Sequence, residues 1–304
     1  MATPKQRPEW WSLLACPICK VSLLDRGTRL QCNSCSTNFA CTGDVVHFLT
    51  ADNPTQRQLE TPDGSSMVRG YRRPSRAVAA VRRIVSSEFT PGREWRAARS
   101  EVAAGPRPLL VIGSGVQQIP GAMHLDVGDF PGVNVVADAH QLPIADGALA
   151  GVLAEVVFEH LVAPARVVAE TLRTLAPGGR FFFTVPFLFP YHGHPGDYRR
   201  WSRQGLQAEF ADFEDVRTGI HAGPCSAMVN LLSEWVYVAS GCRYPRGYTV
   251  IKGLATALLF PLKFGDLVVR HFPEAHRLAS TLFVTGRKRV PAGATISAAI
   301  SQSS

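Results

Sequence analysis

The sequence predicts an α/β fold in which a doubly wound sheet follows a small cysteine-bounded unit. Between residues 108 and 290, short apolar runs alternate with segments that have the apolar spacing of helices. Residues 1–50 instead carry two CxxC pairs in a segment too short to build a large core of its own. With 304 residues, of which 46% are hydrophobic, the chain is long enough for both units.

Five apolar runs predict the central strands of the sheet. The first run leads into the glycine turn Gly113-Ser-Gly115, and the second and third end at Asp126 and Asp138. Residues 164–175, between the fourth and fifth runs, have helical spacing and stop at Pro-Gly-Gly. This alternation is typical of parallel sheets, which bind ligands at the carboxyl ends of their strands. The predicted strands are residues 109–112, 122–126, 133–137, 149–157 and 180–185.

Two further strands and an apolar insert complete the domain. Residues 202–210 predict a helix with Ser202 as its N-cap, and residues 214–220 predict the sixth strand. The last strand is predicted at residues 281–286. The insert between these two strands, residues 225–278, is too apolar for a plain loop. It can be additional core, a lid over an apolar substrate, a dimer face or an interfacial membrane element.

Residues 1–50 predict a structural zinc site. Cys16 and Cys19 form one CxxC knuckle, and Cys32 and Cys35 form a second one after a gap of twelve residues. Two such knuckles bring four thiolates together in the tetrahedral arrangement that Zn²⁺ prefers in closed sites. The metal would then supply the folding energy of this small unit. The predicted strands of the unit are residues 21–24 and 28–31.

The segment from Leu14 to Leu49 resembles the small zinc-ribbon subunits that activate tRNA- and rRNA-modifying methyltransferases. It is also similar to the zinc domain at the front of some bacterial rRNA guanine methyltransferases, in which a histidine often replaces one cysteine. The four cysteines of this chain favour the first resemblance. We interpret Cys41 as a spare thiol outside the metal site. Because zinc ribbons are common adaptors, this unit alone does not identify a substrate.

The net charge of +8 is concentrated in one stretch. Residues 67–107 contain ten Arg and three Glu, a net charge of +7. We interpret residues 51–107 as a solvated, partly helical linker, and a surface for RNA or anionic lipid is the alternative. The N-terminus has no apolar run typical of a signal peptide, and the longest apolar stretch is shorter than the ~20 residues of a membrane span. We therefore expect a cytoplasmic protein, with peripheral membrane contact through the insert, and a disordered tail at residues 291–304.

The ordered set of strand ends resembles class I S-adenosylmethionine-dependent methyltransferases, the type-11 group in particular. The resemblance covers residues 109–220 through VIGSG, HLD, VVADAHQLPIADGALAGVLAEVVFEHL and LRTLAPGGRFFFTVPF. It implies a Rossmann-like sheet, mostly parallel with an antiparallel last strand, and S-adenosyl-L-methionine as cofactor. In that family the glycine turn holds the methionine part, the acid after the second strand holds the ribose, and the acid after the third strand faces adenine. The cofactor residues expected on this basis are Gly113, Ser114, Gly115, Asp126, Val127, Asp138, Ala139 and Glu155.

One departure from the family concerns the connection after the glycine turn. Only ten residues separate Gly115 from Asp126, so the helix that usually follows the turn is shortened or lost, which affects residues 116–119. A nicotinamide dehydrogenase would need GxGxxG, and Gln118 breaks that pattern. Asp126 and Asp138 can alternatively act as turn caps.

The loop after the fifth predicted strand carries the candidate catalytic residues. Residues 190–201 resemble the PYHxxPxDxxR stretch of methyltransferases associated with glycan or other polar small-molecule substrates. We predict His192 or His194 as the general base and Arg199 as an orienting group. The alternatives are a hydrogen-bonded loop lock, or a metal site that combines both histidines with Asp197.

Three functions remain. The leading one is methyl transfer to an O or N atom of a small-molecule, glycan or lipid-linked acceptor, which the insert and the histidine loop favour. The second is RNA methylation (rRNA or tRNA), which the zinc unit and the Arg-rich stretch favour. The third is a non-catalytic adaptor, which the short glycine turn favours. Cofactor binding separates the third function from the others, and salt-sensitive RNA binding separates the first two.

Overall fold

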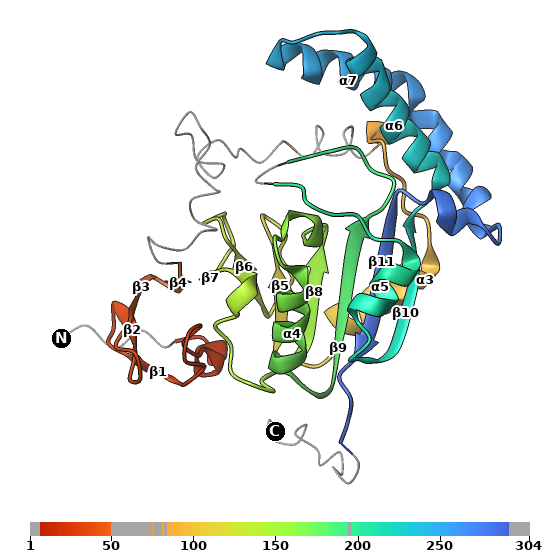
Figure 1. The fold of residues 1–304 in the computed structure, drawn as a ribbon. Coiled ribbons are helices and arrows are strands. Elements are labelled where there is room, and N and C mark those ends of the chain that lie inside the picture. The colour runs from red at the N-terminus through yellow and green to blue at the C-terminus, as the bar shows by residue number, and fades with distance from the viewer. Residues whose placement is uncertain (1–6, 50–74, 76–80, 82–83, 194–195, 292–304) are drawn as a thin grey trace.

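The described part of the chain forms one continuous sheet of eleven strands (Figure 1). Its strand order is β1-β2-β3-β4-β7-β6-β5-β8-β9-β11-β10. Strands β1 to β4 belong to the cysteine-bounded unit, and the other seven belong to the central domain. Most of the predicted linker and nearly all of the predicted tail lie outside the described residues. The computed structural model describes residues 7–49, 75, 81, 84–193 and 196–291.

The seven central strands confirm the predicted doubly wound sheet. Neighbouring strands from β7 to β9 are parallel. The last strand, β11, runs antiparallel to both β9 and β10, as the family resemblance implies. The strands are β5 (Leu109–Ile112), β6 (Ala122–Asp126), β7 (Val135–Val136), β8 (Leu149–Glu155), β9 (Leu175–Pro186), β10 (Glu214–Ala222) and β11 (Thr281–Arg287).

Helices cover both faces of the central sheet. Successive side chains of a strand point to opposite faces, and each face has its own buried apolar cluster. One face is covered by α3, and the other by α4 and α5 (Figure 1). These helices are α3 (Arg93–Ala103), α4 (Pro164–Thr174) and α5 (Arg203–Glu209).

Two observations on these helices bear on the sequence analysis. The Ser202 hydroxyl accepts the Gly205 N–H at 3.1 Å, which confirms the predicted N-cap of α5. Helix α3 changes the predicted domain boundary, because Ala98 and Val102 are buried against the sheet. The end of the segment interpreted as a linker is therefore a core helix of the central domain.

The cysteine-bounded unit is an extension of the same sheet. Val46 and His47 of β4 pair in parallel with Val135 and Val136 of β7. Trp11, Leu14, Phe39 and Phe48 join the buried cluster that also contains α4. The unit therefore has no independent core, and its position is fixed against the central domain. Its strands are β1 (Leu23–Asp25), β2 (Arg29–Cys32), β3 (Asn38–Thr42) and β4 (Val45–His47), of which the last two were not predicted.

The connection from β5 to β6 contains no helix. Its chain is folded by turns, in which the Gln117 N–H donates to the Ser114 carbonyl at 2.8 Å. The Ile119 N–H donates to His124 Nε2 at 2.9 Å. The shortened connection predicted from the sequence is thus present, and hydrogen bonds to β6 hold it in place.

The insert forms a helical hairpin followed by short 3-10 turns. Helices α6 (Pro224–Ala239) and α7 (Pro245–Leu259) pack against each other and project from the end of the sheet at which β10 ends (Figure 1). Most of their large apolar residues are exposed, which argues against the insert as additional core. Within the described residues, no helix has the length and apolar character of a membrane span. The turns that lead to β11 are η4 (Phe260–Leu267), η5 (Val269–His271) and η6 (Ala275–Leu278).

Candidate cofactor and acceptor site

The glycine turn after β5 is held by the acid at the end of β6. Asp126 is 8% exposed, and its carboxylate oxygens accept the N–H groups of Gly115 at 2.8 Å and Gly128 at 3.0 Å. Burial raises the pKa of Asp126, and these N–H donors oppose the rise. Gly113 and Gly115 have φ values of +62° and +50°, a conformation that favours glycine. The structure thus brings the predicted turn and the predicted ribose ligand together.

The turn offers both space and an unused polar group. The Ser114 side chain is buried, and its Oγ has no hydrogen-bond partner among the described residues. A Cβ added at Gly115 would meet no described atom within 4 Å. Val127, which follows Asp126 directly, is partly buried. Buried hydroxyl groups usually have partners, so the turn fits a polar ligand on its open side.

Glu155, at the end of β8, is occupied by the protein itself. Arg99 of α3 forms a bidentate ion pair with the Glu155 carboxylate at 2.8 and 3.0 Å, and the Gln117 side-chain amide donates to the same carboxylate at 3.0 Å. Burial alone would raise the pKa of Glu155, but these partners more than offset burial and hold the pKa below its usual range. These contacts tie α3 and the glycine turn to β8, and the role of Glu155 in cofactor binding stays a prediction.

Asp138, predicted to face adenine, caps the short turn η2 (Ala139–Gln141). Its Oδ1 accepts the His140 N–H at 2.9 Å and lies 2.6 Å from His140 Nδ1. Because the Ala163 N–H donates to His140 Nε2 at 3.2 Å, Nδ1 carries the ring proton and donates to Asp138. The turn-cap alternative thus describes the observed contacts of Asp138, and its role toward adenine stays a prediction.

The zinc-ribbon unit borders this position. A hollow of about 50 Å³ lies beside Asp138. Its walls come from the first cysteine knuckle, from two aromatic residues of the unit and from the end of β7. The unit therefore contributes to the surface on which the adenine end of a cofactor is expected. The lining residues are Pro17, Ile18, Phe39, Phe48, Ala137, Asp138 and Gln141.

The histidine loop after β9 folds onto Glu159 of η3 (Phe158–His160). Glu159 is fully buried, and its Oε1 lies 3.2 Å from His192 Nε2 and 3.7 Å from His160 Nε2. The Tyr198 N–H donates to the Glu159 carbonyl at 2.7 Å, which ties the loop to η3. A Cβ added at Gly113 would lie 2.3 Å from the Val157 side chain, just before η3. The histidine cluster and the glycine turn are thus neighbours at one edge of the sheet.

The loop is locked by an ion pair of its own. Arg200 binds both carboxylate oxygens of Asp197, one of them at 2.6 Å, and lowers the pKa of Asp197 to about 2. Asp197 also accepts the His192 N–H at 2.9 Å and lies 3.4 Å from His192 Nδ1. The hydrogen bond to Glu159 raises the pKa of His192 against the effect of burial. His192 thus stands between two carboxylates that favour its protonated form.

The three predicted catalytic residues differ in where the structure places them. His192 lies in the cluster, and His194 lies outside the described residues. Arg199 is exposed and makes a 3.4 Å contact with the Val162 carbonyl, whereas the neighbouring Arg200 holds the loop. Arg200 binds Asp197 and His194 lies outside the described residues, so the alternative of a metal site with Asp197 as a ligand stays a prediction.

The sequence analysis assigned no role to Glu159, although this residue lies just after the fourth predicted strand. It also missed Glu88, which lies in the segment interpreted as a linker. Glu88 accepts the Ser280 hydroxyl at 2.8 Å, and burial raises its pKa, with His192 acting in the opposite direction. Glu88 is therefore a third carboxylate near the histidine cluster, after Glu159 and Asp197.

The four predicted zinc ligands come together. The sulfur atoms of Cys16, Cys19, Cys32 and Cys35 lie within 4.8 Å of one another, and those of Cys16 and Cys35 are 3.7 Å apart. A tetrahedral Zn²⁺ site with Zn–S bonds of about 2.3 Å has sulfur separations of roughly 3.8 Å, so the donor set and its spacing fit the metal. Burial raises the pKa of the Cys16 thiol to about 12, whereas the Thr37 hydroxyl lowers that of Cys35 to about 6. Cys41 lies outside the cluster, as predicted.

The lowered pKa of His221, a residue of β10, predicts that the folded protein loses stability in acid. The centroids of the His221 and Trp95 rings are 4.6 Å apart, and His221 Nδ1 lies 3.0 Å from the Thr281 hydroxyl. Burial lowers the pKa of His221 to about 4. Because the folded-state pKa lies below the ordinary value of 6.5, its contribution to stability is present above pH 6.5 and is lost as the pH falls through 4. We expect the free energy of unfolding to fall by up to about 3 kcal/mol over this range from His221 alone. Urea unfolding should show a shallower decline in His221→Gln, and an equal decline in both proteins would contradict the assignment.

Comparison with known proteins adds family information to this geometry. Residues 119–183 match the family model described as a methyltransferase domain. Two curated relatives, from Mycobacterium avium (strain 104) and Mycolicibacterium paratuberculosis (strain ATCC BAA-968 / K-10), are both named uncharacterized methyltransferase. Each is 35% identical over 126 residues, which cover 33% of this chain and 47% of the relative. The chain thus spans about half the length of the curated relatives it matches.

Solved structures resemble the chain more distantly. A SAM dependent methyltransferase from Archaeoglobus fulgidus is 15% identical, with a TM-score of 0.40, over 70% of this chain and 100% of that one. Phosphoethanolamine N-methyltransferase 2 from Haemonchus contortus, in complex with S-adenosyl-L-methionine, is 14% identical, with a TM-score of 0.42, over 70% and 56%. Residues 119–183 are thus similar to a methyltransferase domain, and the strand order of the described sheet is that of a Rossmann-like fold.

Proposed function

We propose that the protein transfers the methyl group of S-adenosyl-L-methionine to an O or N atom of a small-molecule, glycan or lipid-linked acceptor. One observation carries the proposal: the glycine turn held by Asp126 and the Glu159–His192 pair lie at the same edge of the sheet. A cofactor site and a proton acceptor side by side are what methyl transfer to an O–H or protonated N–H group needs. An adaptor would not need the second element.

The residues present fit the cofactor. Asp126 uses one lone pair of each carboxylate oxygen for a backbone N–H and keeps the others for the two ribose hydroxyls. The open side of Gly115 and the buried Ser114 hydroxyl would receive the methionine part. When bound, the cofactor supplies a methyl carbon already activated by a positively charged sulfur. The protein therefore needs to align the acceptor and remove its proton.

His192 is the proton acceptor in this proposal. In the neutral ring, Nε2–H donates to Glu159, so Nδ1, which lies 3.4 Å from both the Pro190 carbonyl and Asp197, is the nitrogen that would take a proton from the acceptor. The bound cofactor would supply the methyl group to the acceptor atom and would leave with the electron pair of its carbon–sulfur bond. The proton ends on His192 Nδ1, where Asp197 at 3.4 Å stabilises the charge. Loss of the imidazole should slow transfer by about 10²–10⁴-fold.

The pH dependence of His192 can be checked without knowledge of the acceptor. Its pKa is raised chiefly by Glu159, so the neutral, proton-accepting form prevails only above that raised pKa. Activity should rise with pH through it, and Glu159→Gln should move the titration of His192 to lower pH. NMR titration of the imidazole C–H signals, assigned with His192→Gln, measures this shift. Glu101→Gln, an exposed carboxylate on α3, should leave it unchanged, and an unshifted titration in Glu159→Gln would remove Glu159 from the mechanism.

The acceptor class can be found by following the transferred methyl group. The protein is incubated with methyl-labelled S-adenosyl-L-methionine and a cell extract, which is then separated into RNA, lipid and small water-soluble fractions. We expect label in the lipid or small-molecule fraction, and none with the His192→Gln protein. Label in RNA would instead support the RNA alternative, which rests on the zinc unit and the Arg-rich stretch.

We also propose that the Cys16–Cys19–Cys32–Cys35 cluster holds one structural Zn²⁺. The all-sulfur donor set and its spacing support a closed site. The metal would fix the first knuckle, which lines the hollow beside Asp138. Zinc would then act on cofactor binding indirectly, through the position of β4 against β7.

A further inference from the structure

The first helix of the insert presents its apolar side to solvent. On α6, Ser226 and Asn230 are buried against the domain, whereas Trp235 and Val238 are each 65% exposed. The Ser226 hydroxyl donates to the buried Asp266 at 2.7 Å, and the Asn230 amide donates to the Ser280 hydroxyl at 3.3 Å. On the surface helix of a water-soluble domain, apolar residues face the core and polar residues face water. Helix α6 departs from this arrangement, because it buries polar residues beside Ala227 and Val229 and exposes large apolar side chains.

The segment after α7 shows the same departure. Lys263 and Asp266 are 1% and 0% exposed, although their neighbours Leu262, Leu267 and Val268 are exposed. Lys263 donates to two backbone carbonyls at 2.7 and 2.8 Å, and Asp266 accepts the first N–H groups of α6. The two charged residues of η4 therefore make internal contacts, and the outer surface of this segment is apolar.

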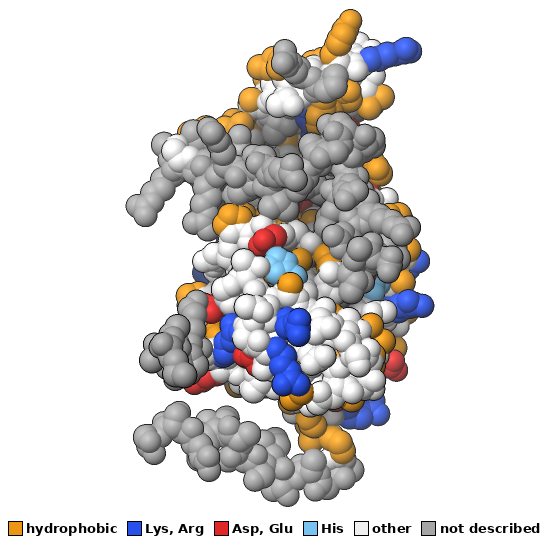
Figure 2. All heavy atoms as spheres, turned by 90° about the vertical axis from the view of Figure 1, so that its left-hand side faces the viewer, with side chains coloured by type: hydrophobic (Ala, Val, Ile, Leu, Met, Phe, Trp, Pro, Cys, Tyr) orange, Lys and Arg blue, Asp and Glu red, His pale blue; other side chains and the backbone are white. Residues whose placement is uncertain are grey.

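Helix α7 extends the same surface. Val250, Leu254 and Leu258 recur every fourth residue and are 57%, 68% and 80% exposed. The charged side chains described on α6 and α7 are Glu234 and Lys252, and they pair with each other at 2.6 Å. Continuous apolar surfaces of this kind mark contacts with membranes or partners. Figure 2 shows hydrophobic side chains gathered at the hairpin end of the molecule.

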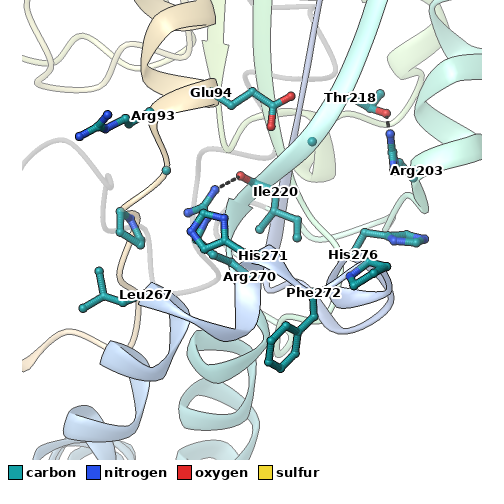
Figure 3. A pocket seen from close by; sticks show the side chains of 14 residues that line it. Arg93, Glu94, Arg203, Thr218, Ile220, Leu267, Arg270, His271, Phe272 and His276 are labelled. Atoms are coloured by element: carbon teal, nitrogen blue, oxygen red, sulfur yellow. Dashed lines mark hydrogen bonds between the residues drawn. The ribbon is translucent and has the colours of Figure 1, made fainter.

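A basic cavity of about 490 Å³ opens beside the apolar surface and apart from the candidate cofactor site (Figure 3). Leu267 and Phe272 belong to both the cavity wall and the exposed apolar surface. Arg203 and Arg270 donate to neutral groups, the Thr218 hydroxyl and the Ile220 carbonyl, and the charge of Arg270 is partly balanced by the nearby Asp266 and Glu94. With three arginines and one glutamate in its wall, the cavity is still net basic and suits an anion. The titratable side chains of the wall are Arg93, Glu94, Arg203, Arg270, His271 and His276.

We infer that the insert docks onto an anionic lipid bilayer, with the apolar side of α6, α7 and η4 in the interfacial region and a lipid phosphate in the basic cavity. An apolar face with a basic site at its rim is the arrangement of interfacial membrane proteins. A second copy of the chain would cover the apolar face but would leave the cavity without a counterion. The inference does not depend on the proposed methyl transfer.

The sequence next to the hairpin agrees with an anionic surface. Residues 64–87 contain six Arg and no Asp or Glu. Lys263 holds the end of this stretch through the carbonyls of Ile84 and Ser86. The described end of this stretch therefore lies against η4, and the attraction of its arginines to anionic lipid would add to apolar burial.

Vesicle sedimentation with the full chain tests the inference. We expect binding to vesicles of phosphatidylcholine with phosphatidylglycerol, and much weaker binding to phosphatidylcholine alone. Leu254→Ser with Leu258→Ser should weaken binding by about tenfold for each leucine removed from the bilayer. Leu24→Ser, at the opposite edge of the sheet and 38% exposed, is the matched control and should bind normally. Arg93→Gln with Arg203→Gln should reduce the preference for phosphatidylglycerol, and the arginines of residues 64–87 should account for what remains.

Tryptophan fluorescence is a second test, and it uses proteins that still bind vesicles. Trp235 should be quenched by brominated lipid, and Trp235→Phe should bind vesicles while losing that share of the quenching. No binding to either vesicle, equal binding by the Leu254→Ser/Leu258→Ser protein, or unchanged quenching in Trp235→Phe would overturn the inference. Self-association that the two leucine changes abolish, without vesicle binding, would assign the surface to a second copy of the chain.

Discussion

The Asp126→Ala protein is expected to bind S-adenosylhomocysteine at least about 10²-fold more weakly than the unchanged protein. Each hydrogen bond from a ribose hydroxyl to the carboxylate is worth about 1.5–3 kcal/mol, and the substitution removes two of them. It also removes the two acceptors that hold the Gly115 and Gly128 N–H groups, so the glycine turn loses its anchor. Isothermal titration calorimetry of both proteins measures the change.

The control for this substitution is Asp129→Ala, an exposed acid three residues further along the chain. It should bind the ligand as the unchanged protein does. Thermal unfolding of all three proteins separates lost binding from lost folding. Equal affinity in folded Asp126→Ala would refute the ribose assignment. If the unchanged protein did not bind S-adenosylhomocysteine, the adaptor function would be favoured. The short connection after Gly115 would then have removed the cofactor site.

Cys16→Ser is expected to remove the metal and to disorganise the unit that β4 belongs to. Elemental analysis should fall from about one zinc per chain to nearly none, since three thiolates hold Zn²⁺ poorly in a structural site. Affinity for S-adenosylhomocysteine should fall as well, because the hollow beside Asp138 is walled by Pro17 and Ile18 of the same knuckle.

Cys41→Ser is the matched control for the metal site, since Cys41 belongs to the same unit but not to the sulfur cluster. It should keep its zinc and its affinity for the ligand. A full zinc content in Cys16→Ser would contradict the site. Normal ligand affinity in a zinc-free protein would show that the unit only adjoins the cofactor position.

The sequence predicted what depends on local pattern. The strands β5, β6 and β11, the cap at Ser202 and the cysteine cluster follow from apolar runs, turn residues and ligand spacing. The missing helix after Gly115 was also foreseeable, since ten residues cannot hold a turn, a helix and a return to the sheet. Each of these features is encoded within a short window of the chain.

What the sequence did not predict depends on contacts between distant segments. The pairing of β4 with β7 joins residues about ninety positions apart in the sequence, and no local pattern predicts this pairing. Glu155 looked like a free ligand because Arg99 comes from a helix assigned to the linker. Glu159 acquires its meaning only when the histidine loop returns to it. The insert was recognised as apolar, but its buried charges, Lys263 and Asp266, give no sign in the sequence that they face inward.

The junction of β4 with β7 has a consequence for the protein without its metal. A strand at the border of a sheet exposes unpaired N–H and C=O groups that can recruit strands from other molecules. β4 covers that border for β7, whose Val135 and Val136 are both buried. If the sulfur cluster lost its ion and β4 came away, an apolar template for intermolecular pairing would be uncovered. Zinc would then protect the protein from aggregation as well as hold one of its units together.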